Sequence, residues 1–135
     1  MKSNLIHYRA CVCNINYHIV WSVKYRRKVL SADIEKYLKA LSQIIAVKHH
    51  FTVHQFECGE KDHIHCFISA PPTTSISSIV KTLKGTMARE VFKTFPSVKR
   101  YLWGGHLWNP SYYVETIGSV SEENIRRYIS GQKEG

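Results

Sequence analysis

Two histidines one residue apart, His63 and His65, have the residue types and the spacing to do chemistry. Side chains of a β-strand alternate between its two faces, so both imidazoles should lie on one face, about 7 Å apart along the chain. Ile64 should then point to the opposite face, toward a core, together with Cys66 and Ile68. Two neighbouring imidazoles can supply two ligands of a metal site. The simpler alternative is a surface strand that carries two histidines by chance, so the rest of the chain must decide.

The first element expected before this pair is a strand over residues 14–24. Its residues alternate strictly between an apolar set and a more polar set, which is typical of a half-buried strand. A helix over residues 31–49 should follow, because Ser31 can cap its first turn and acidic residues occupy that turn. Apolar residues at helical spacing give this helix one buried face: Ile34, Leu38, Leu41 and Ile45.

A hairpin should carry the histidine pair. Residues 51–57 indicate a second strand, and a turn at 58–62 returns the chain into the histidine strand. Pro71 ends that strand, and Thr74 or Ser75 then caps a second helix. The apolar stripe of this helix is typical of core packing: Ile76, Ile79, Val80, Leu83, Met87 and Val91.

The last third of the chain predicts one more strand and one more helix. Residues 101–117 are rich in aromatic side chains and indicate a fourth strand, bent where residues 104–105 and 109–110 interrupt it. Gly118 breaks the chain, and Ser121 then caps a short terminal helix.

The expected order of elements is β-α-β-β-α-β followed by the terminal helix. This order is typical of an α+β fold of the ferredoxin-like or RNA-recognition-motif type, in which two helices cover one face of an antiparallel sheet. The 135 residues (1–135) fit a single domain, with a core at about 10–118 and the terminal helix at about 121–132. In the usual strand order, the first strand neighbours the histidine strand. His18 would then join His63 and His65 on the open face, where a substrate can reach them.

Charge and composition favour a polyanionic partner inside a cell. The formal net charge is +9, from 19 Lys and Arg against 10 Asp and Glu. No apolar run spans a bilayer and no secretory segment begins the chain, so we expect a cytoplasmic protein with no membrane partner. The four cysteines are expected to be reduced thiols. The candidate phosphate contacts lie in the turn at 24–28 and on the second helix: Lys24, Arg26, Arg27, Lys28, Lys81 and Lys84.

The terminal helix carries two further polar candidates. Tyr128 and Gln132 are four residues apart, so they project from one side of the helix. A tyrosine can attack phosphorus, although its free pKa of about 10 requires help with ionisation. A Gln carbonyl can complete a metal site begun by two histidines. Taken alone, Tyr128 is more simply a packing residue, because the chain has eight tyrosines.

Several blocks of the chain together resemble the small single-tyrosine HUH transposases of the insertion-sequence 200/605 type, which move DNA as single strands. HUH denotes His, a hydrophobic residue and His, here His63-Ile64-His65. Several matching blocks in one order are far more specific than the histidine pair alone. The blocks that carry the resemblance are residues 17–21, 24–30, 62–65, 84–85, 107–118, 120–123 and 125–129, followed by Gln132.

The resemblance implies a role for each matching residue. His63, His65 and Gln132 would hold a divalent ion, Mg²⁺ or Mn²⁺, although this ligand set alone would suit zinc. Tyr128 would cleave the strand, leaving a 5′-phosphotyrosine bond and a free 3′-OH. The substrate would be single-stranded DNA with hairpin ends, and the protein would associate with the nucleoid of a prokaryotic cell while bound to it. The family acts as a homodimer, with active sites expected to be shared in trans.

Two other functions are compatible with these residues. One is a metal-dependent nuclease that uses the same histidines to hydrolyse DNA with water. The other is a single-strand-binding module without catalysis, because sheets of the RNA-recognition-motif type bind single strands through exposed aromatic residues.

Overall fold

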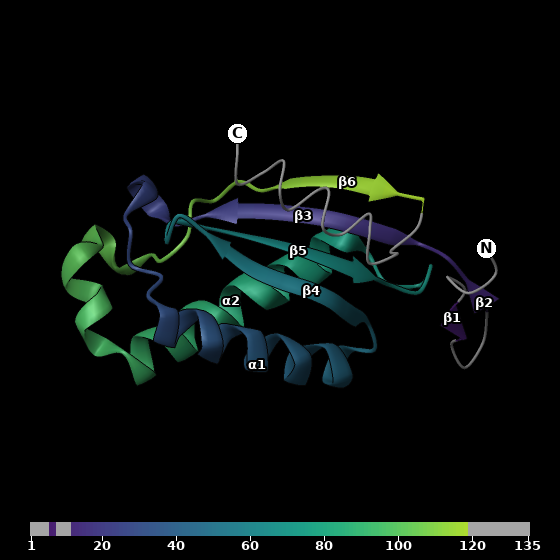
Figure 1. The fold of residues 1–135 in the computed structure, drawn as a ribbon, viewed down its shortest axis with the longest axis horizontal. Helices are drawn as coiled ribbons and strands as arrows, with labels where there is room; N and C mark the ends of the chain where they lie inside the picture. The colour runs from purple at the N-terminus through teal and green to yellow at the C-terminus, as the bar shows by residue number, and fades with distance from the viewer. Residues whose placement is uncertain (1–5, 8–11, 119–135) are drawn as a thin grey trace.

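A four-stranded antiparallel sheet and two main helices organise the chain (Figure 1). The structure is a computed structural model that describes residues 6–7 and 12–118. The strand order is β4-β5-β3-β6, so the first strand of this sheet neighbours the histidine strand, as predicted. The α+β class is also confirmed. The elements are β3 (Asn16–Ser22), α1 (Ala32–His49), β4 (Thr52–Gly59), β5 (His63–Ser69), α2 (Ile76–Thr94) and β6 (Tyr113–Ile117).

Both main helices begin at serine caps. The Ser31 hydroxyl accepts a hydrogen bond from a first-turn N–H of α1 at 3.3 Å, as predicted. α1 ends at His49, and the left-handed backbone of the next residue, His50 (φ 62°, ψ 42°), caps its last turn. At α2 the cap is Ser75 rather than Thr74, and its hydroxyl accepts from the N–H of Ser78 at 3.1 Å.

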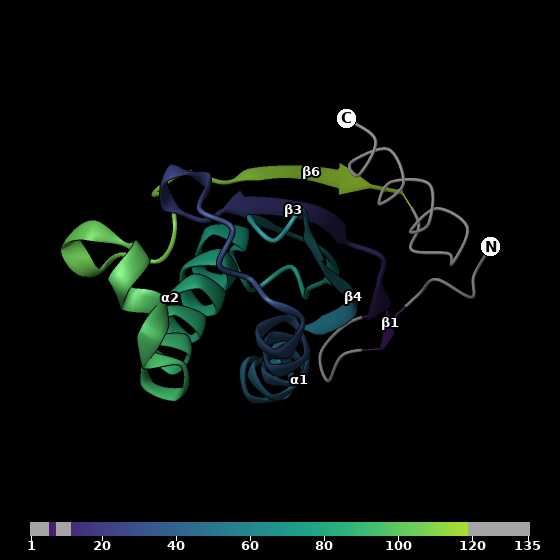
Figure 2. The ribbon, with the colours of Figure 1, turned by 60° about the vertical axis from the view of Figure 1, so that its left-hand side comes forward.

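The hydrophobic core lies between the helices and one face of the sheet (Figure 2). β5 contributes Ile64, Cys66 and Ile68, which are all fully buried, as the alternation of that strand predicted. β3 contributes Ile19 and Trp21 from the same face. The helices bury their apolar stripes against these residues: Ile34, Leu38 and Ile45 from α1, and Ile79, Val80, Leu83, Met87 and Val91 from α2.

The predicted fourth strand is present as β6, which pairs with β3, but it covers only Tyr113–Ile117, so its predicted extent over 101–117 is wrong. Before β6 the chain forms two 3₁₀ helices, η3 (Pro96–Tyr101) and η4 (Trp103–Gly105). Gly104 and Gly105 have φ values of 79° and 71°, a left-handed conformation that glycine adopts without steric cost and that cannot continue a strand.

Residues 107–111, which we call the bridging segment, join β3 to α2. The Asn109 backbone N–H donates to the Ser22 carbonyl at 2.9 Å, and the Asn109 amide donates to the Ser22 hydroxyl at 2.8 Å. On the other side, the Trp108 indole N–H donates to the Lys84 carbonyl at 3.0 Å. The bridging segment therefore links the end of β3 to the middle of α2 before the chain enters β6.

A chain of side-chain hydrogen bonds, the polar chain, crosses the sheet at the end opposite to the histidine pair. His54 Nε2 donates to Ser69 Oγ at 2.6 Å, and Ser69 donates to Asn16 Oδ1 at 2.5 Å. Asn16 Nδ2 donates to Asn14 Oδ1 at 2.5 Å, and Asn14 Nδ2 donates to the Gly118 carbonyl at 2.9 Å. Because Ser69 gives its only proton to Asn16, His54 must act as the donor. The polar chain thus runs in one direction from β4 to the residue after β6.

Three points concern the remaining parts of the chain. Two short strands, β1 (Ile6–His7) and β2 (Val12–Cys13), pair with each other and were not predicted. The predicted helix at 121–132 lies outside the described residues. Within the described part of the chain, no helix is long and apolar enough to cross a membrane.

Candidate active site

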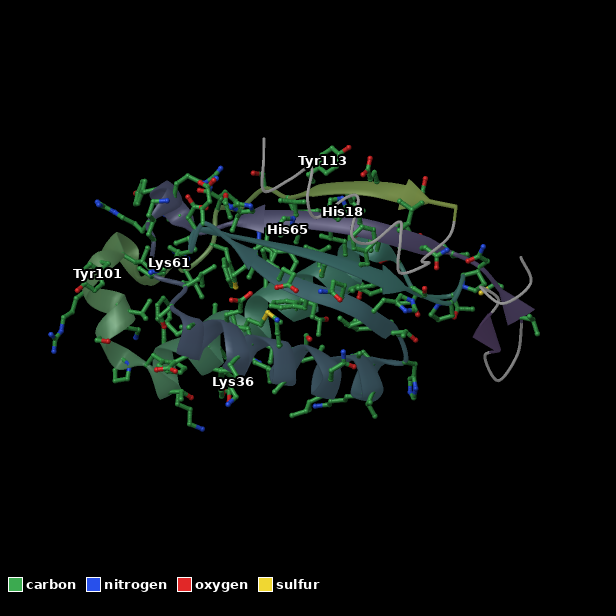
Figure 3. All side chains as sticks on the ribbon, viewed as in Figure 1. His18, Lys36, Lys61, His65, Tyr101 and Tyr113 are labelled. Carbon is green, nitrogen blue, oxygen red and sulfur yellow. The ribbon has the colours of Figure 1, made fainter. Side chains whose placement is uncertain are left out.

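The histidine pair lies on the face of β5 that points away from the core. The imidazole centroids of His63 and His65 are 5.1 Å apart. His18 lies on the neighbouring strand β3, with its ring 6.2 Å from that of His65 and stacked on Phe67 at 4.7 Å. Figure 3 shows His18 and His65 projecting close to each other from these two strands. The structure therefore brings together the three histidines that the sequence placed on one face.

The expectation that these rings are open to a substrate is wrong for two of them. His18 and His65 have 0% exposed surface, and only His63 keeps some, at 8%. Ring packing among His18, His65 and Phe67 contributes to this burial. Solvent therefore reaches the histidine cluster through His63.

His63 opens into a pocket of about 500 Å³ between the hairpin turn, the end of β3 and the start of β6. The pocket is large enough for a phosphate with its attached sugar. Its walls carry one cationic side chain, several hydroxyls and one carboxylate. The described residues that line it are Val20, Trp21, Ser22, Arg26, Glu60, His63, Ser111, Tyr112 and Tyr113.

Asp62 fixes the orientation of the His63 ring. Its carboxylate accepts a hydrogen bond from His63 Nδ1 at 2.7 Å, and its side chain is only 7% exposed. Burial favours a higher pKa for Asp62, but hydrogen bonds from His63 and Arg26 outweigh burial and lower the pKa. The carboxylate stays ionised and keeps the proton on Nδ1, which leaves Nε2 as the ring nitrogen for a metal.

The predicted basic turn at 24–28 is attached to this carboxylate. Arg26 Nη2 lies 3.3 Å from one oxygen of Asp62, and Lys28 Nζ lies 3.8 Å from the other. Lys28 also donates to the Glu60 carbonyl at 3.2 Å. Tyr25 and Arg26 have positive φ values of 60° and 52°, which turn the chain sharply beside the pocket. Arg26 is therefore both a pocket wall and a partner of Asp62.

His18 has a carboxylate partner of its own. Its Nδ1 lies 3.3 Å from Glu115 Oε1 on β6. Burial lowers the pKa of His18, and the hydrogen bond and charge of Glu115 only partly oppose that effect. The neutral form is therefore favoured in the folded protein.

Lys84, a predicted DNA contact, holds the bridging segment. Its ammonium donates to the Asn109 carbonyl at 2.6 Å and to the Ser111 carbonyl at 3.3 Å. Burial lowers the pKa of Lys84. Lys81, one turn earlier on α2, is exposed. The two lysines therefore differ in surroundings, although the sequence treated them alike.

The remaining predicted site residues, Tyr128 and Gln132, lie outside the described residues. Within the described part of the chain, no group of three or more His, Cys, Asp and Glu side chains is arranged to hold a metal ion. The described residues thus offer two imidazole ligands, His63 and His65. The carboxylate on His63 Nδ1 fits a metal-binding role, because metal-binding imidazoles usually donate their second N–H to such a group.

Sequence reasoning missed two residues that act on His63. Asp62 directly precedes it, and this adjacency is a signal that was available. Gly59 is its cross-strand partner in the hairpin. The His63 ring lies over Gly59 so closely that a Cβ at position 59 would overlap it.

The sequence is similar to known transposases over nearly its whole length. A family model described as Transposase IS200 like matches residues 11–132. ISDra2 transposase TnpA of Deinococcus radiodurans is 40% identical over 124 residues, which cover 92% of this chain and 88% of that protein. A transposase for insertion sequence element IS200 of Salmonella typhimurium is 30% identical over 121 residues, which cover 90% of this chain and 78% of that protein.

Solved structures agree with this similarity. A crystal structure from Deinococcus radiodurans, described as that of a transposase, superposes with a TM-score of 0.74 at 37% identity and covers 94% of this chain and 97% of that one. A REP-associated tyrosine transposase bound to a REP hairpin superposes with a TM-score of 0.60 at 16% identity and covers 96% of this chain and 74% of that one. At this identity, the similarity concerns the fold alone. Because the family model spans most of the chain and the identities extend over most of each relative, the chain belongs to the IS200-like family of transposases.

Proposed function

We propose that this protein cleaves and rejoins single-stranded DNA at the ends of an insertion sequence. The observation that carries the proposal is the adjacent pair of imidazoles, with the His63 ring oriented by Asp62 and open to a pocket lined by Arg26. A guanidinium beside an oriented imidazole suits a DNA phosphate, because Arg binds phosphate oxygens in a fixed geometry.

Tyr128 is the proposed nucleophile. Its phenolic oxygen loses its proton and attacks the scissile phosphorus, so a new P–O bond forms and the bond from phosphorus to the 3′ oxygen breaks. The 3′ oxygen leaves and takes up a proton, while the 5′ end stays attached to the tyrosine. The phosphotyrosine ester conserves the energy of the broken bond. A 3′-OH from another DNA end can therefore reverse the step and join new strands without ATP.

His63, His65 and Gln132 are the proposed ligands of a divalent ion, Mg²⁺ or Mn²⁺. When bound, the ion would supply positive charge at the scissile phosphate and assist departure of the 3′ oxygen. Asp62 keeps the His63 proton on Nδ1, and Arg26 gives the pocket a positive charge for the DNA backbone.

The proposed substrate is single-stranded DNA whose ends form hairpins. The structural relative bound to a REP hairpin supports this choice, as does the net charge of +9. The protein is proposed to act as a homodimer in which Tyr128 and Gln132 of one subunit meet the histidines of the other. The basic residues proposed to contact the backbone are Lys24, Arg26, Arg27, Lys28, Lys81 and Lys84.

The test is a cleavage assay with labelled single-stranded DNA that carries an insertion-sequence end. Wild-type protein with Mg²⁺ or Mn²⁺ should give a covalent protein–DNA band on a denaturing gel. Tyr128→Phe should abolish the band, because phenylalanine lacks the attacking oxygen. His65→Ala should abolish cleavage while single-strand binding largely survives.

Matched controls are Tyr112→Phe and Tyr113→Phe, because both tyrosines line the pocket yet should keep the covalent band. A band that persists in Tyr128→Phe would contradict the assignment of the nucleophile. Cleavage without any covalent band would favour a hydrolytic nuclease, and binding without cleavage would favour a non-catalytic module.

A further inference from the structure

The His63 imidazole is held on two sides, and we infer that Gly59 and Asp62 are positioning residues that fix this ring for metal binding. The inference rests on the proposed function, because it assumes that His63 is a metal ligand. It adds to that function two residues of the β4–β5 hairpin that neither bind metal nor touch DNA.

Asp62 determines which ring nitrogen of His63 carries the proton. Its carboxylate receives the Nδ1 proton of His63 at 2.7 Å, so the neutral ring has its lone pair on Nε2. Two cations also hold the carboxylate: Arg26 lies 3.3 Å from the same oxygen, Oδ1, and Lys28 lies 3.8 Å from Oδ2. The Asp62 carbonyl also accepts from the Val23 N–H at 2.8 Å. Asp62 is therefore fixed by backbone and side chain before it orients the ring.

Gly59 supplies the space that the ring occupies. Gly59 and His63 are register partners across the hairpin, and the ring fills the space where a Cβ of residue 59 would lie. A Cβ at position 59 would overlap Nε2 and Cε1, the edge of the ring that must face a metal. The backbone of Gly59 lies outside the left-handed region, so the requirement for glycine here is space rather than backbone freedom.

The backbone of the hairpin turn has little room to shift. Glu60 and Lys61 both have positive φ values, 49° and 62°, and the Asp62 N–H donates to the Gly59 carbonyl at 3.1 Å. The Lys61 carbonyl accepts from the Leu30 N–H at 3.0 Å, which attaches the turn to the chain before α1. A methyl group at position 59 must therefore displace the His63 side chain rather than the backbone around it.

The main experiment compares Gly59→Ala with Gly85→Ala. Gly85 lies in α2, where an added Cβ meets its nearest neighbour, Arg89, at an ordinary 3.9 Å. In metal-free protein with ¹⁵N-labelled histidine, Gly59→Ala should shift the ring nitrogen signals of His63, identified by their loss in His63→Ala. It should also raise the Mn²⁺ concentration for half-maximal cleavage by about 10-fold or more, the usual effect of disturbing a ligand's support. Gly85→Ala should change neither quantity.

A second pair of variants tests Asp62. Asp62→Asn keeps an oxygen that can accept from Nδ1, whereas Asp62→Ala removes it. Asp62→Ala should let the proton move from Nδ1 to Nε2 of His63 and should raise the required Mn²⁺ concentration. Asp62→Asn should keep the proton mostly on Nδ1 and the Mn²⁺ requirement close to that of the wild type. If Gly59→Ala yields too little folded protein, this pair decides the question.

Each outcome separates the inference from the proposed function. If Gly59→Ala and Asp62→Ala leave the His63 signals and the Mn²⁺ requirement unchanged while His63→Ala abolishes cleavage, the positioning role is wrong and the metal role stands. If His63→Ala itself cleaves like the wild type, the proposed function fails. Loss of cleavage with unchanged ring signals would also overturn the positioning role, because the ring would not have moved.

Discussion

Two histidines of the sheet, the buried His18 and the half-buried His54, have pKa values lowered by burial, which favours their neutral form. The pKa of His54 is lowered by burial, and that of His18 is lowered by burial against the opposing effect of Glu115. A neutral His54 can still donate from Nε2 to Ser69, so the polar chain is complete without a buried charge. Folding becomes less favourable only when acid protonates the His54 ring, because a charge in a partly buried position is unfavourable.

We therefore predict that His54 makes the folded protein less stable in acid. Its folded-state pKa lies below the ordinary value of 6.5, so the unfolded chain takes up the proton first. The contribution is complete above pH 6.5 and is lost as the pH falls from there through the lowered pKa. His54→Gln keeps a donor for Ser69 and removes the titration. In urea unfolding from pH 7.5 to 5 in EDTA, it should lose less stability than the wild type.

The control for this prediction is His49→Gln, at the exposed end of α1. This variant removes an exposed histidine instead of the half-buried His54, so its loss of stability in acid should match that of the wild type. Equal losses in wild type and His54→Gln would show that the acid sensitivity comes from other groups.

The sequence predicted those parts of the candidate site that follow from strand alternation and strand order alone. Alternation along a strand placed His63 and His65 on one face, and the strand order added His18. The role of Asp62 depends on its rotamer and on Arg26, which comes from a distant turn, and neither follows from a pattern. The importance of Gly59 appears only once the register of the hairpin is known, because the ring of its cross-strand partner fills the space.

On helix α2, the neighbouring lysines Lys81 and Lys84 are expected to differ in function. Lys84→Met removes the ammonium that binds the Asn109 and Ser111 carbonyls. We predict a loss of about 1.5–3 kcal/mol in the free energy of unfolding, the usual range for hydrogen bonds to a charged group. Because Ser111 lines the pocket, cleavage should fall as well. Urea denaturation and the cleavage assay measure these two effects.

Lys81→Met is the matched variant on the same helix. An exposed lysine should change stability by less than about 0.5 kcal/mol. If it contacts a phosphate, its removal should reduce the log–log salt slope of single-strand binding by about 0.7. The prediction fails if the two variants lose equal stability, because the contacts of Lys84 would then contribute nothing.

Elements with their own local signals were predicted well. Serine caps and helical periodicity defined α1 and α2, and alternation defined β3 and β5. The stretch before β6 was mistaken for strand because its aromatic residues favour strands, whereas its path depends on contacts with Ser22 and Lys84. Such contacts join residues far apart in sequence, so no local pattern contains them.

For the whole molecule, we predict that each active site draws residues from two subunits. His63→Ala and Tyr128→Phe are each expected to be inactive alone. When they are mixed and allowed to exchange subunits, one site of a trans heterodimer combines intact histidines from one chain with an intact Tyr128 from the other. Cleavage should then return toward half of the wild-type activity per dimer.

The control is the same mixture with the subunits cross-linked within each homodimer before mixing, which should stay inactive. In a cis arrangement both sites of the heterodimer retain one lesion. No activity from verified heterodimers would therefore rule out shared sites for the cleavage step.

The single direction of the polar chain has a consequence for how the sequence can diverge. His54 donates to Ser69, and each later member accepts from the one before it and donates onward, through Ser69 and Asn16 to Asn14. Replacing one member by an apolar residue leaves a donor or an acceptor unmatched on another strand, which is costly when that group is buried. These four positions should therefore change together among homologues, as a co-varying set that spans residues 14–69. A designer who alters one of them should redesign the others in the same step.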